Sequence, residues 1–344
     1  MNEPLLEFDD LTIEYETRNG AITAVSDASF AIHRGEYFGL AGESGCGKST
    51  AAKSLLNILD DNGQISSGAI RYKGEELQNK SEKYMTEHIY WNEVSYIPQS
   101  SMDSLDPLKK ISRQAVEIAQ THTDMTKQES LEKFKEMFEI VGIQENRIDD
   151  YPHEFSGGMQ QRAIIALALF LEPSLIVADE PTTALDVIMQ DQIFKYLDRI
   201  KETTDVSMIL ITHDISVIFE SCDSLAIMHS GQIAETASCR DLFDTPRHPY
   251  SILLQQAFPD VDHPDRELQT IDGYPPQLGE DVDFCTFADR CPWAVSECRD
   301  AAPPLERIED SETGRDHYAA CIRTEEVRRS YEGDATPAEV DNDI

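Results

Sequence analysis

Residues 42–50 read Gly42-Glu43-Ser44-Gly45-Cys46-Gly47-Lys48-Ser49-Thr50, which fits the pattern G-x-x-x-x-G-K-[ST] of a phosphate-binding loop. The apolar residues 36–41 before it predict a short strand, and the helical spacing of apolar residues in 48–59 predicts a helix after it. Glycines in such a turn let successive backbone N–H groups point at a phosphate, assisted by the helix N-terminus. A glycine-rich turn that matches by chance is the alternative, and the strand and helix on either side argue against it.

From this loop we predict the contacts of a bound nucleotide. Lys48 reaches the β- and γ-phosphates, and the hydroxyl of Ser49 binds Mg²⁺. The loop residues expected to contact the nucleotide are Gly42, Ser44, Gly45, Cys46, Gly47, Lys48, Ser49 and Thr50.

A second motif, Leu175-Ile176-Val177-Ala178-Asp179-Glu180, brings carboxylates to the end of an apolar strand. Ligands bind at the C-terminal ends of strands in open α/β sheets. We predict that Asp179 holds Mg²⁺ and that Glu180 polarises the water that attacks the γ-phosphorus. Acidic residues are common in this chain, so this motif alone is weak evidence for a magnesium site. Together with the phosphate loop it is strong evidence.

The segments around these motifs alternate between strands and helices. Strands are expected at residues 5–15, 22–32, 36–41, 70–72, 175–178 and 207–211, and helices at 48–59, 184–203 and 215–221. Residues from 106 to 143 have helical periodicity, which predicts a helical insertion. This alternation indicates an α/β domain with a largely parallel sheet.

Composition limits the class of protein. The 344 residues are 40% hydrophobic and 27% charged, as in ordinary folded proteins. Lys plus Arg number 29 against 65 Asp plus Glu, a formal net charge of −36, so nucleic-acid binding is not expected. The acids are spread along the chain, which favours adaptation to a salt-rich cytoplasm over an acidic surface for a basic partner.

The chain shows no signal peptide, and its most apolar run, residues 163–178, is interrupted by Glu172 and Pro173, so we expect a protein that is soluble by itself. Prolines and cysteines become frequent after residue 258. We therefore expect a nucleotide-binding domain at residues 1–257 with a helical insertion at about 106–172. A Cys/Pro-rich region at 258–329 and an acidic mobile tail at 330–344 follow.

A third motif, Phe155-Ser156-Gly157-Gly158-Met159-Gln160-Gln161-Arg162, precedes a long apolar helix. Ser156 is a suitable helix N-cap, and the glycines expose N–H groups to an anion. Together with the two motifs above, this sequence resembles the nucleotide-binding subunits of ABC transporters over residues 5–257. The third motif is similar to the signature of that family, which closes over the ATP that the other subunit holds. Phe155 stands in place of the usual Leu.

The resemblance implies the fold: a P-loop ABC ATPase with a parallel core sheet, an antiparallel β subdomain and a helical subdomain. It also implies roles for further residues. Gln99 resembles the glutamine that touches Mg²⁺, Asp186 the loop that crosses the dimer interface, and His213 the histidine at the γ-phosphate. Tyr15 stands where the family stacks an aromatic ring on adenine. The signature residues implied to bind the partner's ATP are Ser156, Gly157, Gly158 and Gln160.

Other phrases resemble the oligopeptide and dipeptide importer subfamily: the run from Pro181 to Val187, His248-Pro249-Tyr250, Gly273-Tyr274-Pro275-Pro276, and the cysteines 285, 291, 298 and 321. Some members of that subfamily hold an iron–sulfur cluster there. Four thiolates suit a four-iron–four-sulfur cluster or a structural zinc ion, and the wide spacing favours the cluster over CxxC-type zinc pairs. Free thiols or disulfides remain the alternatives for Cys285, Cys291, Cys298 and Cys321.

The resemblance implies an import motor at the cytoplasmic face of the cell membrane that uses ATP and Mg²⁺. Its expected partners are a second ABC ATPase subunit, identical or related, two membrane permeases and a solute-binding protein. A soluble ABC ATPase acting on DNA or ribosomes is the rival, disfavoured because the chain has one ATPase half and no heptads. Peptides are the expected cargo, with nickel and sugars as alternatives.

Overall fold

The computed structural model describes residues 3–99, 104–183, 185–257, 271–274, 276, 284–309, 313 and 315–331. The chain divides into two compact units, which are described separately. The loop unit comprises Met1–Ile32, Phe38–Gln78 and Thr212–Ile344, and the helical unit comprises His33–Tyr37 and Asn79–Ile211. Among the helices in the described ranges, none has the length and apolar character needed to cross a membrane.

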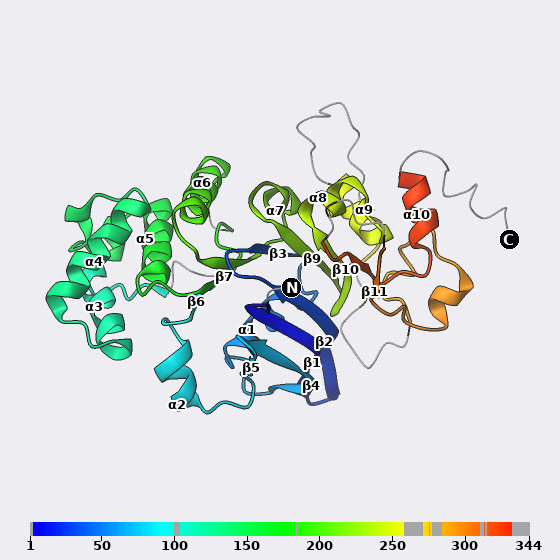
Figure 1. The fold of residues 1–344 in the computed structure, drawn as a ribbon, viewed down its shortest axis with the longest axis horizontal. Helices are drawn as coiled ribbons and strands as arrows, with labels where there is room; N and C mark the ends of the chain where they lie inside the picture. Colours follow the sequence, from blue (N-terminus) through cyan, green and yellow to red (C-terminus); the bar gives the residue numbers. More distant parts are fainter. Residues whose placement is uncertain are drawn as a thin grey trace. The chain divides into compact units, whose positions relative to one another are not determined.

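An antiparallel sheet in the loop unit has the strand order β2-β1-β4-β5 (Figure 1). Its strands are β1 (Leu6–Thr17), β2 (Gly20–Ile32), β4 (Gly63–Tyr72) and β5 (Glu75–Glu76). Alternate residues of β1 point into the core, and Phe8 stacks on its cross-strand partner Phe30 with ring centroids 4.4 Å apart. The antiparallel β subdomain implied by the family resemblance is confirmed.

The loop unit also contains the strand that leads into the phosphate loop and the strands beside it. Strand β3 (Tyr37–Ala41) pairs in parallel with β9 (Ser224–His229), and β10 (Gln232–Ser238) is antiparallel to β9. In the described residues of this unit, the helices are α1 (Lys48–Leu55), α7 (Ile215–Ser221), α8 (Cys239–Asp244), α9 (Pro249–Gln256) and α10 (Thr324–Tyr331), with a short 3₁₀ turn at Ser296–Arg299.

In the helical unit, three parallel strands lie in the order β8-β7-β6, namely β6 (Val94–Ile97), β7 (Leu175–Asp179) and β8 (Ser207–Ile211). All residues of β7 and β8 are buried, as strands covered on both faces must be. Helix α6 (Val187–Thr203) joins β7 to β8. Short helical turns lie at Glu82–Tyr84 (α2), Met85–Ile89, Glu145–Arg147 and Pro152–Glu154.

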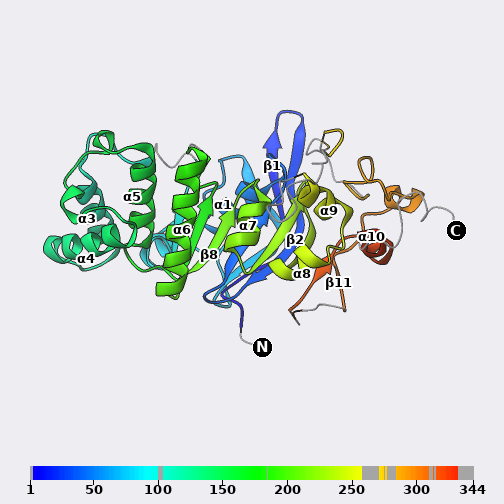
Figure 2. The ribbon, with the colours of Figure 1, turned by 90° about the horizontal axis from the view of Figure 1, so that it is seen from above.

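The predicted helical insertion contains α3 (Ile111–His122), α4 (Lys127–Ile140) and α5 (Gly157–Leu169). They lie side by side in both ribbon views (Figure 2). Phe134 of α4 is fully buried and packs on Phe138 and Phe170 at centroid distances of 4.8 and 5.3 Å. These aromatic contacts hold α4 against the end of α5.

Two predicted boundaries differ from the structure by four residues or more, and the helix expected at 184–203 begins at Val187 because Asp186 is its N-cap. The helix expected at 48–59 ends at Leu55, because Asn57 adopts the left-handed conformation (φ 52°) that terminates a helix. The strand expected at 70–72 begins earlier, at Gly63, because the whole segment pairs with β1. The mobile tail predicted at 330–344 falls, beyond Tyr331, outside the described residues.

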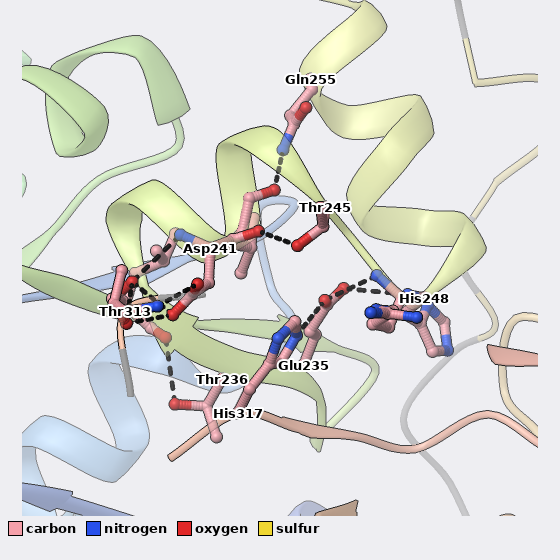
Figure 3. A network of polar contacts seen from close by, with 12 residues as sticks. Glu235, Thr236, Asp241, Thr245, His248, Gln255, Thr313 and His317 are labelled. Atoms are coloured by element: carbon pink, nitrogen blue, oxygen red, sulfur yellow. Dashed lines mark hydrogen bonds and ion pairs between the residues drawn. The ribbon is translucent and has the colours of Figure 1, made fainter. Parts of the chain in front are cut away.

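The C-terminal region adds strands to the loop unit. Strand β12 (Tyr318–Ala319) pairs with β10, and β11 (Glu306–Arg307) pairs with β12. Figure 3 shows the polar contacts beside these strands. Glu235 of β10, fully buried, accepts hydrogen bonds from the backbone N–H groups of Arg247 (2.7 Å) and His248 (2.9 Å), and its carboxylate lies 2.7 Å from His317 Nε2. This buried carboxylate therefore joins β10, the start of α9 and the C-terminal region.

Candidate functional site

The phosphate loop (residues 42–50) follows β3 and leads into α1. Gly42 and Gly47 have φ values of 143° and 104°, which side-chain-bearing residues rarely adopt. A Cβ at Gly42 would lie 2.1 Å from the carbonyl oxygen of Met228, and one at Gly47 would lie 2.5 Å from that of Ala24. Gly47 is the N-cap of α1 and has no side chain to occupy the first N–H groups of the helix, which leaves them available to an anion.

Lys48 is 5% exposed and its ammonium group lies inside the loop. Its Nζ donates to the carbonyl oxygens of Gly42 (2.8 Å) and Glu43 (2.9 Å). The ammonium is therefore held at the loop that is expected to receive the phosphates. Ser49 and Thr50 follow in the first turn of α1, where the Ser49 hydroxyl provides an oxygen ligand of the kind that Mg²⁺ prefers.

Cys46, within the phosphate loop, is buried. Burial raises the pKa of its thiol, an effect that the nearby Lys48 partly offsets. The thiol would lie 2.9 Å from a Cβ at Gly42, so it fills the space under the loop. A protonated, buried thiol is typical of a small packing residue.

Residues far along the chain hold the loop, and no motif in the sequence assigned them to it. The Cys46 carbonyl accepts a hydrogen bond from the N–H of Gly231 in the β9–β10 turn (2.9 Å). The N–H of Glu43 donates to the hydroxyl of Tyr250 in α9 (3.0 Å), and the Glu43 carboxylate pairs with Arg290. Only the His-Pro-Tyr phrase around Tyr250 gave a signal, and it pointed to the subfamily rather than to the loop.

Tyr15 and His213 also belong to the loop unit. Tyr15 is half-buried on β1, and its ring lies over Gly63 of β4, where a Cβ would come within 2.8 Å. His213 is exposed just after β8 and before α7, at the position predicted from the sequence. Their contacts with adenine and with the γ-phosphate stay predictions.

In the helical unit, Asp179 ends β7 and is 1% exposed. Its carboxylate accepts a hydrogen bond from the hydroxyl of Tyr96 on β6 at 2.9 Å. Burial, and then the charge of Asp179, raise the pKa of Tyr96, so this phenol stays a donor. The donor fixes the orientation of a buried carboxylate, as residues around a metal ligand do.

The structure brings Glu180 and Gln99 together. Gln99 Nε2 donates to Glu180 Oε2 at 2.8 Å, and the Thr183 hydroxyl donates to the same oxygen at 2.8 Å. Glu180 adopts a left-handed backbone conformation (φ 46°), and its N–H donates to the carbonyl of Ile211 at 2.8 Å. Such strain in a non-glycine residue is typical of functional positions. Thr183 was not predicted, although it lies within a quoted motif.

The oxygen atoms predicted to bind Mg²⁺ are a suitable set, comprising a hydroxyl (Ser49), an amide (Gln99) and a carboxylate (Asp179). Ser49 belongs to the loop unit, and Gln99 and Asp179 belong to the helical unit. As ligands, these three residues remain a prediction.

The signature residues begin α5. Ser156 is exposed and caps the helix by accepting from the N–H of Met159 (3.4 Å), which confirms the predicted N-cap. Gly157 is the first helical residue, and a Cβ at Gly158 would lie 1.8 Å from the Met189 methyl of α6. Gly158 thus leaves room for the flexible side chain of Met189, a packing contact that the sequence did not reveal.

Two other predicted ligands have structural contacts. Gln160 donates from Nε2 to the carbonyl of Pro152 at 2.8 Å, which fixes the turn before α5. Asp186 is exposed and caps α6 by accepting from the N–H of Met189 at 3.0 Å. Their predicted roles at a nucleotide are not tested by these contacts.

The four C-terminal cysteines, Cys285, Cys291, Cys298 and Cys321, line one pocket whose walls are almost entirely apolar. We call it the cysteine pocket. Burial raises the pKa of Cys291 and Cys321 to about 12. Backbone N–H groups point at the sulfurs, with Arg323 N–H lying 3.3 Å from Cys321 Sγ. In the described parts of the chain, no three His, Cys, Asp or Glu residues are grouped so as to hold a single metal ion.

The loop between β3 and α1, with its buried lysine, and the carboxylate pair at the end of β7 define a P-loop ATPase. Comparisons with known proteins identify the family within this class. The family model described as ABC transporter matches residues 25–183, and the oligopeptide/dipeptide transporter C-terminal region matches residues 234–298. The chain belongs to the ATP-binding subunits of ABC transporters.

Curated relatives align over nearly the whole chain. A probable peptide ABC transporter ATP-binding protein of Sinorhizobium fredii is 40% identical over 94% of this chain and 96% of its own length. The oligopeptide transport ATP-binding protein OppD of Salmonella typhimurium is 41% identical, covering 88% and 90%. The dipeptide transport ATP-binding protein DppD of Bacillus subtilis is 38% identical, covering 90% and 93%.

Among solved structures, a dimeric ATP-binding cassette bound to ADP and phosphate matches with a TM-score of 0.61 at 23% identity. The match covers 68% of this chain and 99% of that one. It confirms the predicted ABC ATPase fold.

Proposed function

We propose that this chain is the ATP-hydrolysing subunit of an importer of dipeptides or oligopeptides. The observation that carries the proposal is the pairing of Gln99 with Glu180 at the strained end of β7, in a chain that also holds Lys48 inside a phosphate loop. The names of the relatives support a peptide cargo over nickel or sugars.

The residues divide the work of hydrolysis. The phosphate loop and Lys48 bind the β- and γ-phosphates, and the hydrogen bonds from Gln99 and Thr183 hold the Glu180 carboxylate in place to accept a proton from the attacking water. Ser49, Gln99 and Asp179 would hold Mg²⁺, which neutralises phosphate charge when bound.

The motor works as an assembly. Ser156 and Asp186 of this chain contact the nucleotide that is bound to a second ABC ATPase subunit. His213 contacts the γ-phosphate of the nucleotide that is bound to this chain. Two permeases and a solute-binding protein complete the importer at the cytoplasmic face of the membrane. The subfamily of the relatives supports these partners.

Replacing Glu180 tests the hydrolytic role. Glu180→Gln should bind ATP within about threefold of wild type and lose at least about 99% of ATP turnover, because the amide cannot accept the proton. ATP binding and phosphate release measure the two effects. Glu202→Gln, the same change at an exposed site on α6, should leave both unchanged. Wild-type turnover by the Glu180 variant would remove Glu180 as the base.

We further propose that the cysteine pocket holds a four-iron–four-sulfur cluster. Four cysteines around one apolar pocket, with backbone N–H groups directed at sulfur, match the ligand type and surroundings of such clusters. The cluster would be a resident group bound by thiolates. Without a metal the thiols keep their protons at neutral pH, since burial raises the pKa of Cys291 and Cys321.

Anaerobic purification tests this. The protein should be brown and contain iron and acid-labile sulfide in equal amounts, and Cys291→Ser should lose both. Cys222→Ser, a buried cysteine outside the pocket, should keep the colour. Zinc without sulfide would assign a structural metal site instead, and four titratable thiols with no metal would rule out the cluster.

Finally, we propose that the net charge of −36 adapts the protein to a salt-rich cytoplasm. Carboxylates that are spread along the whole chain repel one another less as salt screens them.

A further inference from the structure

Glu43, the second residue of the phosphate loop, is held at three points. Its carboxylate accepts two hydrogen bonds from Arg290, at 2.7 Å (Nη1 to Oε2) and 2.8 Å (Nη2 to Oε1). Its N–H donates to the Tyr250 hydroxyl at 3.0 Å, and its carbonyl accepts from Lys48 Nζ at 2.9 Å. A shift of Glu43 would therefore move the loop backbone and a partner of the phosphate-binding lysine together.

Arg290 is itself fixed. Its side chain is 5% exposed, and its Nε donates to the carbonyl of Asp272 at 3.0 Å. The guanidinium lies over the ring of Phe287, 5.7 Å from the centroid, and Nη1 is 3.4 Å from Nε2 of His229. A planar fork held on several sides is pre-organised for bidentate pairing with a carboxylate.

The charge of this pair matters to an anion-binding loop. Glu43 places a carboxylate in a loop that must accept a triphosphate, and like charges at short range repel strongly where water is scarce. The two hydrogen bonds from Arg290 neutralise that carboxylate. Removal of Arg290 would leave the carboxylate without this partner beside the phosphates.

Arg290 also connects the loop to the cysteine pocket, since it lies in the turn between Cys285 and Cys291. The N–H of Ala288 donates to the Cys285 carbonyl and that of Arg290 to the Phe287 carbonyl, both at 3.0 Å. Phe287 lines the pocket and packs on Tyr250 with ring centroids 5.2 Å apart. The same short turn therefore forms a wall of the cysteine pocket and one support of the phosphate loop.

We propose that Arg290 is a positioning residue for ATP binding: it holds Glu43 in place and neutralises its charge, so that the cysteine-bearing region takes part in the nucleotide site of its own chain. The proposal rests on the assignment of ATP binding to the phosphate loop. It gives the C-terminal region a function within the single subunit.

The test is a double-mutant cycle on the full-length chain, with Mg-ATP affinity measured by calorimetric titration. Arg290→Met should weaken ATP binding about tenfold, because the carboxylate loses its partner. Adding Glu43→Gln should restore affinity to within about threefold of wild type, because the charge is then gone. Arg299→Met, which removes an exposed arginine that follows Cys298 and pairs with Asp289, should bind ATP as wild type does.

Circular dichroism and thermal melting establish that each variant is folded. If Arg290→Met does not fold, Arg290→Lys replaces it, and loss of the bidentate fork should weaken ATP binding about threefold. Wild-type affinity in the folded Arg290 variant overturns the proposal, and so does a double variant that binds no better than the single one. The rescue separates a local charge effect from general damage to the fold.

The variant Lys48→Ala separates the role of Arg290 from the assignment of ATP binding to the phosphate loop, on which that role rests. If Lys48→Ala binds ATP as wild type does, the phosphate loop is not the ATP site and both conclusions fail. If Lys48→Ala loses ATP binding while the Arg290 variants keep it, only the role of Arg290 fails.

Discussion

His229, the last residue of β9, is a buried histidine kept neutral by its surroundings. Burial, and then the nearby His248 and Arg290, lower its pKa to about 3. Since the Arg290 Nη1 that lies 3.4 Å from His229 Nε2 can only donate, Nε2 is the acceptor. Nδ1 therefore carries the proton and donates to the Thr286 hydroxyl at 2.9 Å.

This residue makes stability depend on pH. In the unfolded chain the pKa of a histidine is about 6.5, so below that pH the unfolded state binds a proton that the native state does not. The contribution is complete above about pH 6.5 and is lost as the pH falls toward 3. Between pH 7 and pH 5 the free energy of unfolding falls by about 2 kcal/mol because of this histidine.

His229→Gln should therefore reduce the difference in unfolding free energy between pH 7 and pH 5 by about 2 kcal/mol, as measured by urea denaturation. The glutamine amide can accept a hydrogen bond from Arg290 without titrating. His153→Gln, at an exposed site, should leave the difference unchanged. A His229 variant with the same pH dependence as wild type would contradict this account of the buried ring.

At the scale of elements, the beginning of α5 was predicted from the sequence, whereas the beginning of α6 and some strands were not. Ser156 caps α5 as expected, because short polar side chains satisfy the first N–H groups of a helix. The helix expected from residue 184 begins instead at Val187, after its cap Asp186. Strands β6, β9 and β10 were missed. All residues of β9 are buried, so it has no polar and apolar alternation to mark it.

The motifs of the candidate site lie where strands end and helices begin. Such junctions depend on a few neighbouring residues, which is why these motifs could be predicted from the sequence. The phosphate loop joins β3 to α1, and Asp179 and Glu180 come at the end of β7. Local sequence controls such junctions, since glycine, serine and acidic residues set backbone turns and supply ligands within a few positions. The pairing of Gln99 with Glu180 depends on β6 lying next to β7, and spacing along the chain gives no measure of that.

At the scale of the whole molecule, the net charge of −36 should make stability depend on salt. Raising KCl from 0.1 to 2 M reduces the Debye length from about 10 Å to below about 3 Å, which screens repulsion among the carboxylates. We expect the melting temperature to rise by about 5 °C or more. Sucrose at matched osmolarity controls for general solvent effects, and a melting temperature that stays level or falls in KCl would contradict the salt adaptation.

The primary sequence was sufficient for the class of protein, since the loop at 42–50, the Asp179-Glu180 pair and the signature at Ser156 are contiguous motifs whose chemistry resides in a few neighbouring residues. The supports of the site came from the folded chain. Arg290 reaches Glu43 from 247 positions away, and Glu235 meets His317 across 82. Such contacts form when distant segments pack together, because buried charges need partners. A local sequence pattern does not indicate which distant segments will pack together.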